Sequence, residues 1–407
     1  MSLSARHARL VVGGERESAR EWGAAALWPT PSQKLLLRAA LLDGPDALEA
    51  WSEWKAGHDL IETDLDHGSF RLLPLVYKNL LARRAEEPLM PRLKGIYRYW
   101  WCSNQRLIYR AAGVIRSLGD AGIETLVLKG AATATLFYRD AGVRPMGDID
   151  LLVPVARASS AVAYLGFLGW RPTRARVGDL IRYQHSVRMV NDTGEALDLH
   201  WHVLAECVQP DSDAGFWQRS VPLPVLDARS RALAPTDALL HTVVHGVRWN
   251  EEPTVRWIPD AMAILRAADG SIDWGVLREE ARKRRMLLRL VRGLSYLRRT
   301  LGAPVPYEVL DRLRRTPSAG IERVEYRVLA LGSDRKERLQ WGHVLLVMVQ
   351  YLRFVSGKSL LRKLAETPAY LRYRLRGRPG PVLDAVRGVR RGIRRLFVRR
   401  VLTREPS

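Results

Sequence analysis

Two aspartates, Asp148 and Asp150, lie one residue apart at the start of an apolar run, G-D-I-D-L-L-V. Successive side chains of a β-strand point to opposite faces, so the two carboxylates share one face of the strand that this run predicts. Neighbouring carboxylates repel each other unless a cation lies between them. A hard divalent ion, Mg²⁺ or Mn²⁺, takes oxygen ligands of this kind, and the pair therefore predicts a metal site.

A strand and a glycine turn precede the aspartates. The apolar run Leu126–Leu128 ends at Lys129 and Gly130, which is typical of a buried strand entering a tight turn. We expect a short helix after the turn, whose first backbone N–H groups face a polyphosphate. Lys129 and Arg144 would neutralise charge on a triphosphate, although basic residues near carboxylates are commonly simple ion pairs. Gly147, which opens the aspartate run, completes the predicted nucleotide-binding group.

A hairpin further along supplies a third carboxylate. Residues 185–190 alternate in polarity, Asn191–Gly194 predicts a turn, and residues 195–203 return. Asp198 and His200 share one face of the returning strand, which places Asp198 on a neighbouring strand of the same small sheet. A position near the acceptor and an ordinary polar strand face explain His200 equally well.

Three aspartates on adjacent strands, after a glycine turn, suit phosphoryl or nucleotidyl transfer. Two metal ions held by Asp148, Asp150 and Asp198 would bridge the attacking group, the α-phosphate and the leaving pyrophosphate. A lone D-x-D is a weak signal, because aspartate at a strand end is often a solvated turn residue. The glycine turn and the strand of Asp198 together favour the metal site over that structural interpretation.

The same residues carry a resemblance. The segments L-K-G-A-A, R-P-M-G-D-I-D-L-L-V and L-D-L-H-W-H resemble the bacterial uncharacterised nucleotidyltransferase family within the DNA polymerase β-like superfamily. The resemblance covers residues 126–202, with fainter similarity at His241–His245 and Arg256–Asp260. It implies a minimal mixed sheet with helices, a turn glycine at Gly130, and metal-binding carboxylates at the three aspartates. Family members often accompany polysaccharide or peptide natural-product biosynthesis, and their acceptors are mostly undefined.

The chain departs from the family pattern in the glycine turn. Better-known members place Gly-Ser there, whereas this chain has Gly130 followed by Ala131, so no serine hydroxyl stands beside the glycine. Lys129 is the candidate substitute. On a helix that begins near Pro235, His241 and His245 lie four residues apart and share a face. They lack the glutamate of a zinc protease, so we favour a supporting position near the acceptor over a zinc site.

Composition limits the class of protein. The 407 residues are 47% hydrophobic and include 13 tryptophans, which indicates a folded chain. The net charge is +22, but +13 of it comes from residues 351–407, so the core is only moderately basic and its pI does not indicate nucleic-acid binding. Two cysteines give no disulfide framework, and no run has the length of a signal or membrane-spanning segment, so we expect the cytoplasm.

The pattern of elements predicts an α+β protein with a small mixed sheet embedded between helical regions. The predicted divisions are a mobile segment 1–31, a helical region 32–121, the nucleotidyltransferase core 122–226, a helical region 227–365 and a basic amphipathic tail 366–407. The tail is open to three interpretations: a solvated helix, a surface that docks on an anionic membrane, or a nucleic-acid contact. Its near absence of aromatic residues favours lipid or protein over single-stranded nucleic acid, and hence a peripheral position at the inner membrane face.

The predicted activity is transfer of a nucleoside monophosphate from an NTP to a hydroxyl or phosphate acceptor, with Mg²⁺ or Mn²⁺ as cofactor. The alternative is a non-catalytic nucleotide-sensing or membrane-docked accessory protein of a biosynthetic assembly. Intact carboxylates favour the enzyme, whereas the missing serine and the basic tail favour the alternative.

Overall fold

The structure, a computed structural model, describes residues 27–375 apart from residues 59, 61–64, 175–176, 249–254, 269, 331–346 and 356–358. The chain forms two compact units, Met1–Ala330 and Leu331–Ser407. Residues 1–26 and 376–407 lie outside the described residues, so the predicted mobile segment, most of the basic tail and its membrane docking remain predictions. The same holds for the finer boundaries at 121, 226 and 365. Within the described residues, no helix combines the length and the apolar character needed to cross a membrane.

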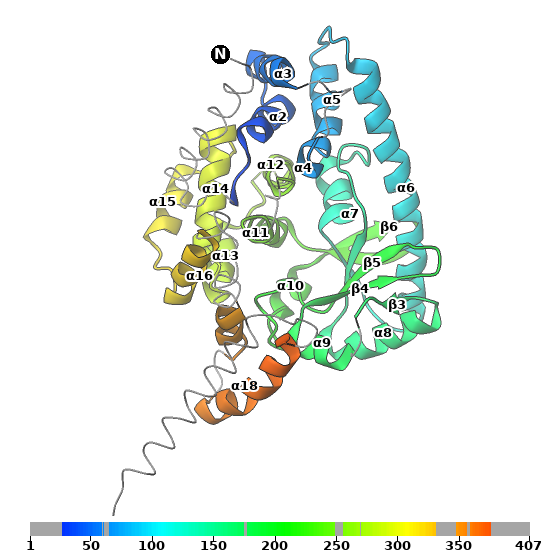
Figure 1. Ribbon diagram of the computed structural model, residues 1–407, viewed down its shortest axis with the longest axis vertical. Coiled ribbons are helices and arrows are strands. Elements are labelled where there is room, and N and C mark those ends of the chain that lie inside the picture. The colour runs from blue at the N-terminus through cyan, green and yellow to red at the C-terminus, as the bar shows by residue number, and fades with distance from the viewer. Residues whose placement is uncertain are drawn as a thin grey trace, which may run out of the picture. The chain divides into compact units, whose positions relative to one another are not determined.

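A mixed seven-stranded sheet lies in the first unit (Figure 1). Its strands are β1 (Leu126–Leu128), β2 (Ile149–Leu152), β3 (Arg171–Pro172), β4 (Ser186–Val190), β5 (Ala196–His200), β6 (Val221–Val225) and β7 (Ala228–Ala232). Their spatial order is β3-β4-β5-β2-β1-β7-β6. Strand β2 runs parallel to β5 and β1 runs parallel to β7, while the other neighbours are antiparallel. The predicted α+β class and mixed sheet are therefore confirmed.

Helices precede, interrupt and follow the sheet. Before it come α2 (Pro31–Leu41), α3 (Pro45–Gly57), α4 (His67–Phe70), α5 (Leu73–Ala82) and α6 (Met90–Asp120). Between its strands lie α7 (Lys129–Thr133), a π-helical turn (Ala134–Tyr138), a 3-10 turn (Val155–Arg157), α8 (Ala158–Phe167), α9 (Val177–Tyr183) and α10 (Ala214–Arg219). After it come α11 (Pro235–Gly246), α12 (Trp257–Ala267), α13 (Trp274–Lys283), α14 (Leu287–Leu301), α15 (Tyr307–Arg315) and α16 (Gly320–Ala330). The second unit contains a helical stretch over residues 347–354 and α18 (Leu360–Leu375).

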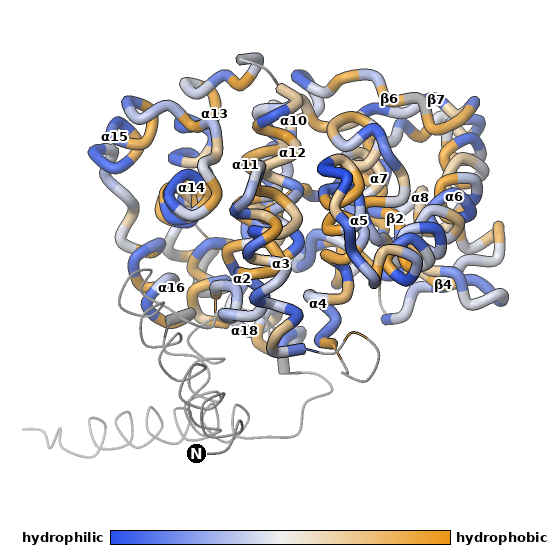
Figure 2. Tube along the Cα trace, turned by 90° about the horizontal axis from the view of Figure 1, so that it is seen from above, coloured by the Kyte–Doolittle hydropathy of each residue, from blue (hydrophilic) through white to orange (hydrophobic). Residues whose placement is uncertain are grey.

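Helix α6 packs along the sheet against β2, β6 and β7 (Figure 1). Its buried residues recur on one stripe: Leu93, Trp100, Asn104, Ala111, Ala112, Ile115 and Leu118. Burial of each large apolar side chain contributes about 1.5–3 kcal/mol, so this stripe fixes the orientation of the helix. Figure 2 shows hydrophobic and hydrophilic segments alternating along the helices, as amphipathic helices require. The one strongly polar member of the stripe, Asn104, contacts the loop that leads to the aspartates.

Helices α11, α12 and α14 form a closely packed group. Gly246 lies against Trp257, and Gly293 lies against Val243, with no room for a side chain at either glycine. Helix α12 also contacts α7 and the π-helical turn. The three helices therefore lie at the end of the sheet where the glycine turn begins. His241 and His245 of α11 lie at the same end.

Candidate functional site

Two strands bring two of the predicted carboxylates together. In the parallel pairing of β2 with β5, Asp150 is the direct partner of Asp198. Leu128, the last residue of β1, is the partner of Asp150 on the other side, so the glycine turn starts beside this carboxylate. Asp150 is only 7% exposed, whereas Asp198 is half-buried.

The Asp150 carboxylate has two close partners. Lys129 Nζ lies 2.5 Å from Asp150 Oδ1, and His200 Nε2 donates to the same oxygen at 2.9 Å. Burial alone would raise the pKa of Asp150, but the charge of Lys129 and the hydrogen bond from His200 outweigh it and hold this pKa far below its usual range. Asp150 is therefore an ionised carboxylate that Lys129 neutralises.

Asp198 has the opposite electrostatic character. Its Oδ1 is buried without a hydrogen-bond partner among the described residues, and Arg188 Nη1 lies 3.8 Å away. Burial, followed by the negative charges of Asp150 and Asp148, raises the pKa of Asp198. The same Arg188 atom lies 3.1 Å from Asp148 Oδ2, so Arg188 stands between the two outer aspartates.

Asp150, Asp198 and His200 could hold a divalent ion. Within the described parts of the chain, one ligand atom from each of the three lies within 4.8 Å of the others. Asp198 Oδ1 and His200 Nδ1 are both buried there without a hydrogen-bond partner, so an oxygen and an imidazole nitrogen are available to bind an ion. Carboxylate oxygens suit Mg²⁺ or Mn²⁺, so the donor set fits the predicted ion. Asp148 lies beside this group, paired with Arg188.

The glycine turn, which forms the first residues of α7, differs from the sequence prediction in which residue adopts the left-handed backbone. Lys129 has a left-handed backbone, with φ of 46°, and such a conformation costs a non-glycine residue about 1 kcal/mol. Gly130 serves close packing instead, because a Cβ there would lie 2.5 Å from Arg144 Nη1 and 2.9 Å from Met146 Sδ. The strained residue of the turn is thus the one whose side chain reaches Asp150.

Arg144 is held by a second aspartate. Its Nη2 lies 2.8 Å from Asp260 Oδ2 and its Nε lies 3.2 Å from both carboxylate oxygens. Tyr138 donates to Asp260 Oδ1 at 3.1 Å. Burial lowers the pKa of Arg144, but the Asp260 carboxylate outweighs this effect and raises it. In this structure Arg144 joins the glycine turn to α12 rather than lying open to a ligand.

Asn104 of α6 fixes the loop that carries Arg144 and Gly147. Its amide nitrogen donates to the carbonyl oxygens of Ala141 and Arg144, at 2.5 and 2.9 Å, and its Oδ1 accepts from Met146 N–H at 3.2 Å. Asn104 is fully buried, so these bonds replace the water that its amide would otherwise bind. The sequence analysis missed this role, and the only available signal was a polar residue on an apolar helix stripe.

Histidines surround Lys129. The rings of His185 and His200 lie 5.3 Å apart, and those of His241 and His245 lie 5.7 Å apart. Burial, then the charge of Lys129 and the proximity of His200, lowers the pKa of His241 to about 3. The pKa values of His185 and His245 are lowered too, chiefly by burial. The two α11 histidines therefore lie in the electrostatic field of the site as neutral rings.

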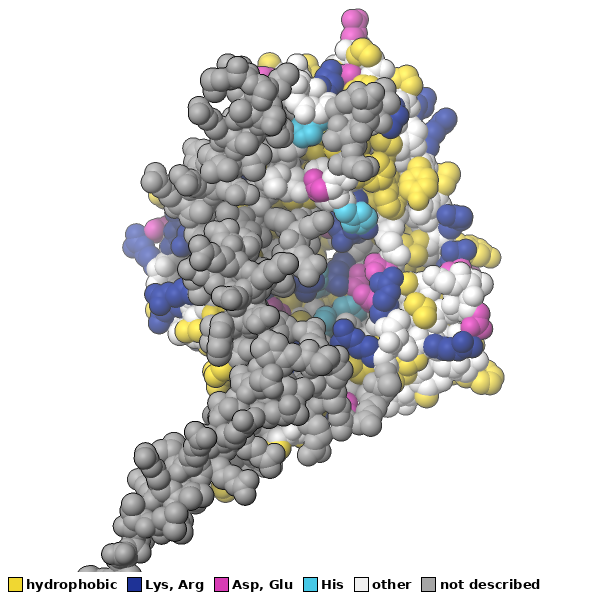
Figure 3. Space-filling view, in the orientation of Figure 1, with side chains coloured by type: hydrophobic (Ala, Val, Ile, Leu, Met, Phe, Trp, Pro, Cys, Tyr) yellow, Lys and Arg dark blue, Asp and Glu magenta, His cyan; other side chains and the backbone are white. Residues whose placement is uncertain are grey.

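Three arginines that the sequence analysis did not select also lie near the carboxylates: Arg71, Arg248 and Arg256. Burial lowers the pKa of each. Asp148 opposes this effect at Arg71 and Arg256, and Asp150 opposes it at Arg248. Arg256 opens the Arg256–Asp260 segment of fainter similarity, which was the available signal for it. In the space-filling view, acidic, basic and histidine side chains gather on one face of the molecule (Figure 3).

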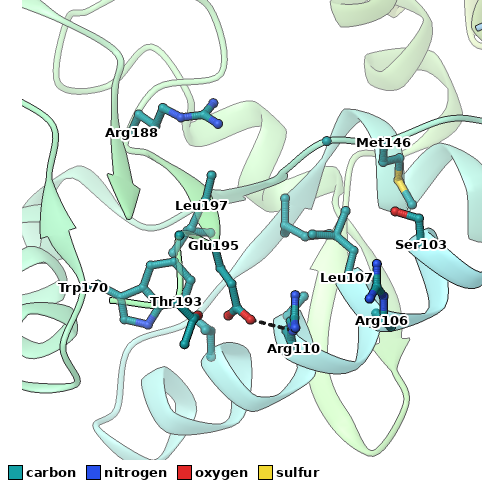
Figure 4. A pocket seen from close by; sticks show the side chains of 16 residues that line it. Ser103, Arg106, Leu107, Arg110, Met146, Trp170, Arg188, Thr193, Glu195 and Leu197 are labelled. Atoms are coloured by element: carbon teal, nitrogen blue, oxygen red, sulfur yellow. Dashed lines mark ion pairs between the residues drawn. The ribbon is translucent and has the colours of Figure 1, made fainter. Parts of the chain in front are cut away.

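A cavity of about 320 Å³ lies beside the aspartate strand. It is lined from α6, from the residues before β2 and from the β4–β5 hairpin, and Figure 4 shows the ion pair between Arg110 and Glu195, 2.7 Å apart, at its wall. The cavity shares Gly147 and Arg188 with the surroundings of Asp148. The predicted acceptor-side histidines, all of which the structure describes, line none of it.

The comparison with family models supports the family named in the sequence resemblance. Residues 69–302 match a family described as uncharacterised nucleotidyltransferase. A crystal structure of an antigenic nucleotidyltransferase-like protein from Paracoccidioides brasiliensis is similar at 14% sequence identity, with a TM-score of 0.33 over 51% of this chain and 97% of that one. A search of curated proteins finds no match.

Proposed function

This chain belongs to the uncharacterised nucleotidyltransferase family, and we propose that it transfers a nucleoside monophosphate from an NTP, such as ATP, to a hydroxyl or phosphate acceptor. The observation that carries the proposal is the pairing of Asp150 with Asp198 beside Lys129. Asp148, Asp150 and Asp198 would hold Mg²⁺ or Mn²⁺. When bound, such ions activate the attacking oxygen and neutralise the α-phosphate and the leaving pyrophosphate, the two-metal chemistry of nucleotidyl transfer.

The side chains of the site have separate tasks in this proposal. Asp198 Oδ1, unpartnered in the described part of the chain, accepts the proton that the acceptor hydroxyl releases. Lys129 moves its ammonium from Asp150 to a phosphate oxygen, which replaces one anion partner with another. Backbone amides at Gly130 and Gly147 would donate to the triphosphate. In this proposal His200, His241 and His245 would stand on the acceptor side.

The cellular setting follows from the resemblance and from the composition. We place the protein in the DNA polymerase β-like superfamily, in a bacterial cytoplasm, with a role in polysaccharide or natural-product biosynthesis. Its basic tail would dock on the anionic inner face of the membrane. Nucleic acid is the less favoured acceptor, because the positive charge concentrates in the tail.

A second candidate function has an observation of its own. Lys129 neutralises Asp150 directly, and Ala131 stands where better-known relatives carry serine. In a protein that binds a nucleotide without turnover, the Lys129 ammonium could neutralise Asp150 in place of a metal ion. This nucleotide-sensing function predicts NTP binding without pyrophosphate release.

The experiment combines binding and turnover. Purified protein is incubated with Mg²⁺ and each of the four NTPs, pyrophosphate release is measured, and NTP binding is followed by calorimetry. We expect metal-dependent binding that disappears in the Asp148→Ala/Asp150→Ala variant. Asp227→Asn is the matched control, since Asp227 is exposed and paired with Arg116.

The outcomes separate the candidates. Binding with pyrophosphate release supports the transferase, and binding that never leads to release with any acceptor supports the sensor. NTP binding that is the same with and without Mg²⁺ contradicts the transferase, and absence of binding to all four NTPs under either condition contradicts both. Circular dichroism of the double variant shows whether a loss of binding is a loss of fold.

A further inference from the structure

Among the described residues, two arginines near Asp148 have no carboxylate at ion-pair distance. Arg71 lies in the turn between α4 and α5, and Arg256 directly precedes α12. Both are half-buried, and in the described part of the chain no carboxylate lies within ion-pair distance of either guanidinium. Arg71 Nε is buried without a hydrogen-bond partner there. We call these two residues the arginine pair.

The neighbouring carboxylates already have partners. Asp260 binds Arg144 at 2.8 Å, and Asp148 binds Arg188 at 3.1 Å. Burial lowers the pKa of Arg256 to about 10, and the positive charges of Arg144 and Arg71 contribute to the shift. The arginine pair therefore adds positive charge to a region whose acids are neutralised by other residues.

Such a charge is costly to bury. An ionised side chain loses hydration on burial, and arginine cannot avoid this cost by deprotonation, because it stays protonated at neutral pH. The usual compensation is an anionic partner with good geometry. The planar guanidinium fork matches the oxygens of a phosphate group, which it binds with two hydrogen bonds. A phosphate-bearing ligand is the anion that this arrangement fits.

The position of the pair indicates which phosphate it would bind. A Cβ built on Gly147 would lie 3.8 Å from Arg71 Nη2, so this guanidinium reaches the residue before Asp148. Asp148 also acts on the pKa of Arg256. A triphosphate whose α-phosphate lies at the aspartates extends its outer phosphates over a neighbouring part of the surface, and two guanidiniums match two phosphates.

We propose that Arg71 and Arg256 form an anion site for the β- and γ-phosphates of the substrate. This assignment rests on the proposed nucleotidyl transfer for the identity of the ligand. A phosphorylated acceptor has the same chemistry, and the experiment distinguishes the two sources. The site itself requires no metal ion, because its charge comes from side chains alone.

The test measures binding of inorganic pyrophosphate by calorimetry in EDTA at low salt. We expect Arg71→Met and Arg256→Met each to weaken binding about tenfold, in line with one lost charged hydrogen-bonding partner. Arg256→Lys keeps the charge and is expected to bind better than Arg256→Met. Arg116→Met is the matched control, because Arg116 lies on α6, is exposed and forms an ion pair with Asp227.

Each outcome decides the proposal. If wild-type protein binds no pyrophosphate, or if the Met variants bind it as tightly as wild type, the arginine pair is not an anion site. If the variants lose pyrophosphate but keep wild-type affinity for Mg²⁺–NTP, the pair binds an acceptor phosphate and the assignment to the triphosphate is wrong. If pyrophosphate binding depends on the pair while Asp148→Ala/Asp150→Ala leaves NTP binding unchanged, the anion site stands and the transferase function fails. Circular dichroism identifies any variant that does not fold.

Discussion

Arginine side chains are buried or half-buried in two regions of this protein, and the two regions differ in the groups that surround the positive charge. In the helical region, Arg289 of α14 lies 2.6 Å from Glu206 and 2.9 Å from Glu325. These carboxylates outweigh burial and raise the pKa of Arg289. Beside Asp148, burial lowers the pKa of Arg71 and Arg256, and neither has a carboxylate at ion-pair distance among the described residues.

The difference separates a structural arginine from a candidate ligand-binding one. Arg289 joins α14 to α16 and to the segment after β5, so its charge is used by the fold itself. The arginine pair has no such use in the described part of the structure. Measurements of stability and of ligand binding should therefore diverge between the two regions, and each prediction below tests that divergence.

The largest effect is expected for Arg289→Met. This change leaves Glu206 and Glu325 without their buried cation, and removal of one partner from a buried ion pair costs about 3–5 kcal/mol. Urea unfolding should show the loss. Arg282→Met is the control, because Arg282 is 58% exposed and solvent screens its pair with Glu279, so this pair should contribute little to stability. Equal stability of the two variants would show that the Arg289 cluster is not a structural support.

Buried His241 differs from the buried arginines because it remains neutral. The folded-state pKa of His241 is about 3, below the unfolded value, so the unfolded chain takes up a proton first as the pH falls. Stability is therefore full above the unfolded pKa and is lost on acidification, by about 2 kcal/mol at pH 5 from this residue. The charged and titratable groups that face it are Lys129, Asp150, His200, His245 and Arg248.

Urea unfolding at pH 8 and pH 5 checks this prediction. His241→Leu should lose less stability between the two pH values than wild type does, because leucine binds no proton in either state. A parallel pH dependence of the two proteins would show that His241 is protonated in the fold. Circular dichroism at both pH values confirms that the starting states are folded.

Local patterns in the sequence located the carboxylates well. Strand alternation and the glycine turn were enough to select Asp150, Asp198 and Lys129, which the structure brings together. The sequence placed the strand of Asp198 beside the strand of Asp150, but it did not give the parallel direction or the register of that pairing, because two other strands and two helices separate β2 from β5 along the chain. The left-handed backbone at Lys129 was also hidden, since sequence favours the adjacent Gly130 for such a conformation.

The basic residues of the site were harder to identify. The chain has 65 Lys and Arg, and no periodicity distinguishes a buried guanidinium that lacks a partner from an exposed one. The environment of Arg71 and Arg256 comes from the tertiary structure, which places both arginines near Asp148. The nearby carboxylates Asp148 and Asp260 are paired with other arginines. For Arg144 the sequence left open a triphosphate contact or a simple ion pair, and the structure pairs it with Asp260.

Gly130→Ala tests Arg144, which has a carboxylate partner and also lies at the candidate site. Arg144 is paired like Arg289 but lies at the site, and a Cβ at Gly130 would come within 2.5 Å of its Nη1. We expect a loss of about 1–2 kcal/mol on urea unfolding, the usual effect of overpacking. Gly147→Ala is the control, because its Cβ would meet Arg71 at an ordinary 3.8 Å. A Gly130→Ala protein as stable as Gly147→Ala would mean that Arg144 moves without cost.

The smallest effect on stability is expected at the arginine pair itself. Arg256→Met removes a half-buried charge that has no carboxylate at ion-pair distance among the described residues, so the free energy of unfolding should stay within about 0.5 kcal/mol of wild type or rise. Added pyrophosphate should stabilise wild type, since a ligand that binds only the folded state shifts unfolding by mass action, and should stabilise the variant much less. A loss of several kcal/mol without ligand, as expected for Arg289→Met, would instead assign Arg256 to the scaffold, because a charge whose removal unfolds the protein already has its partner.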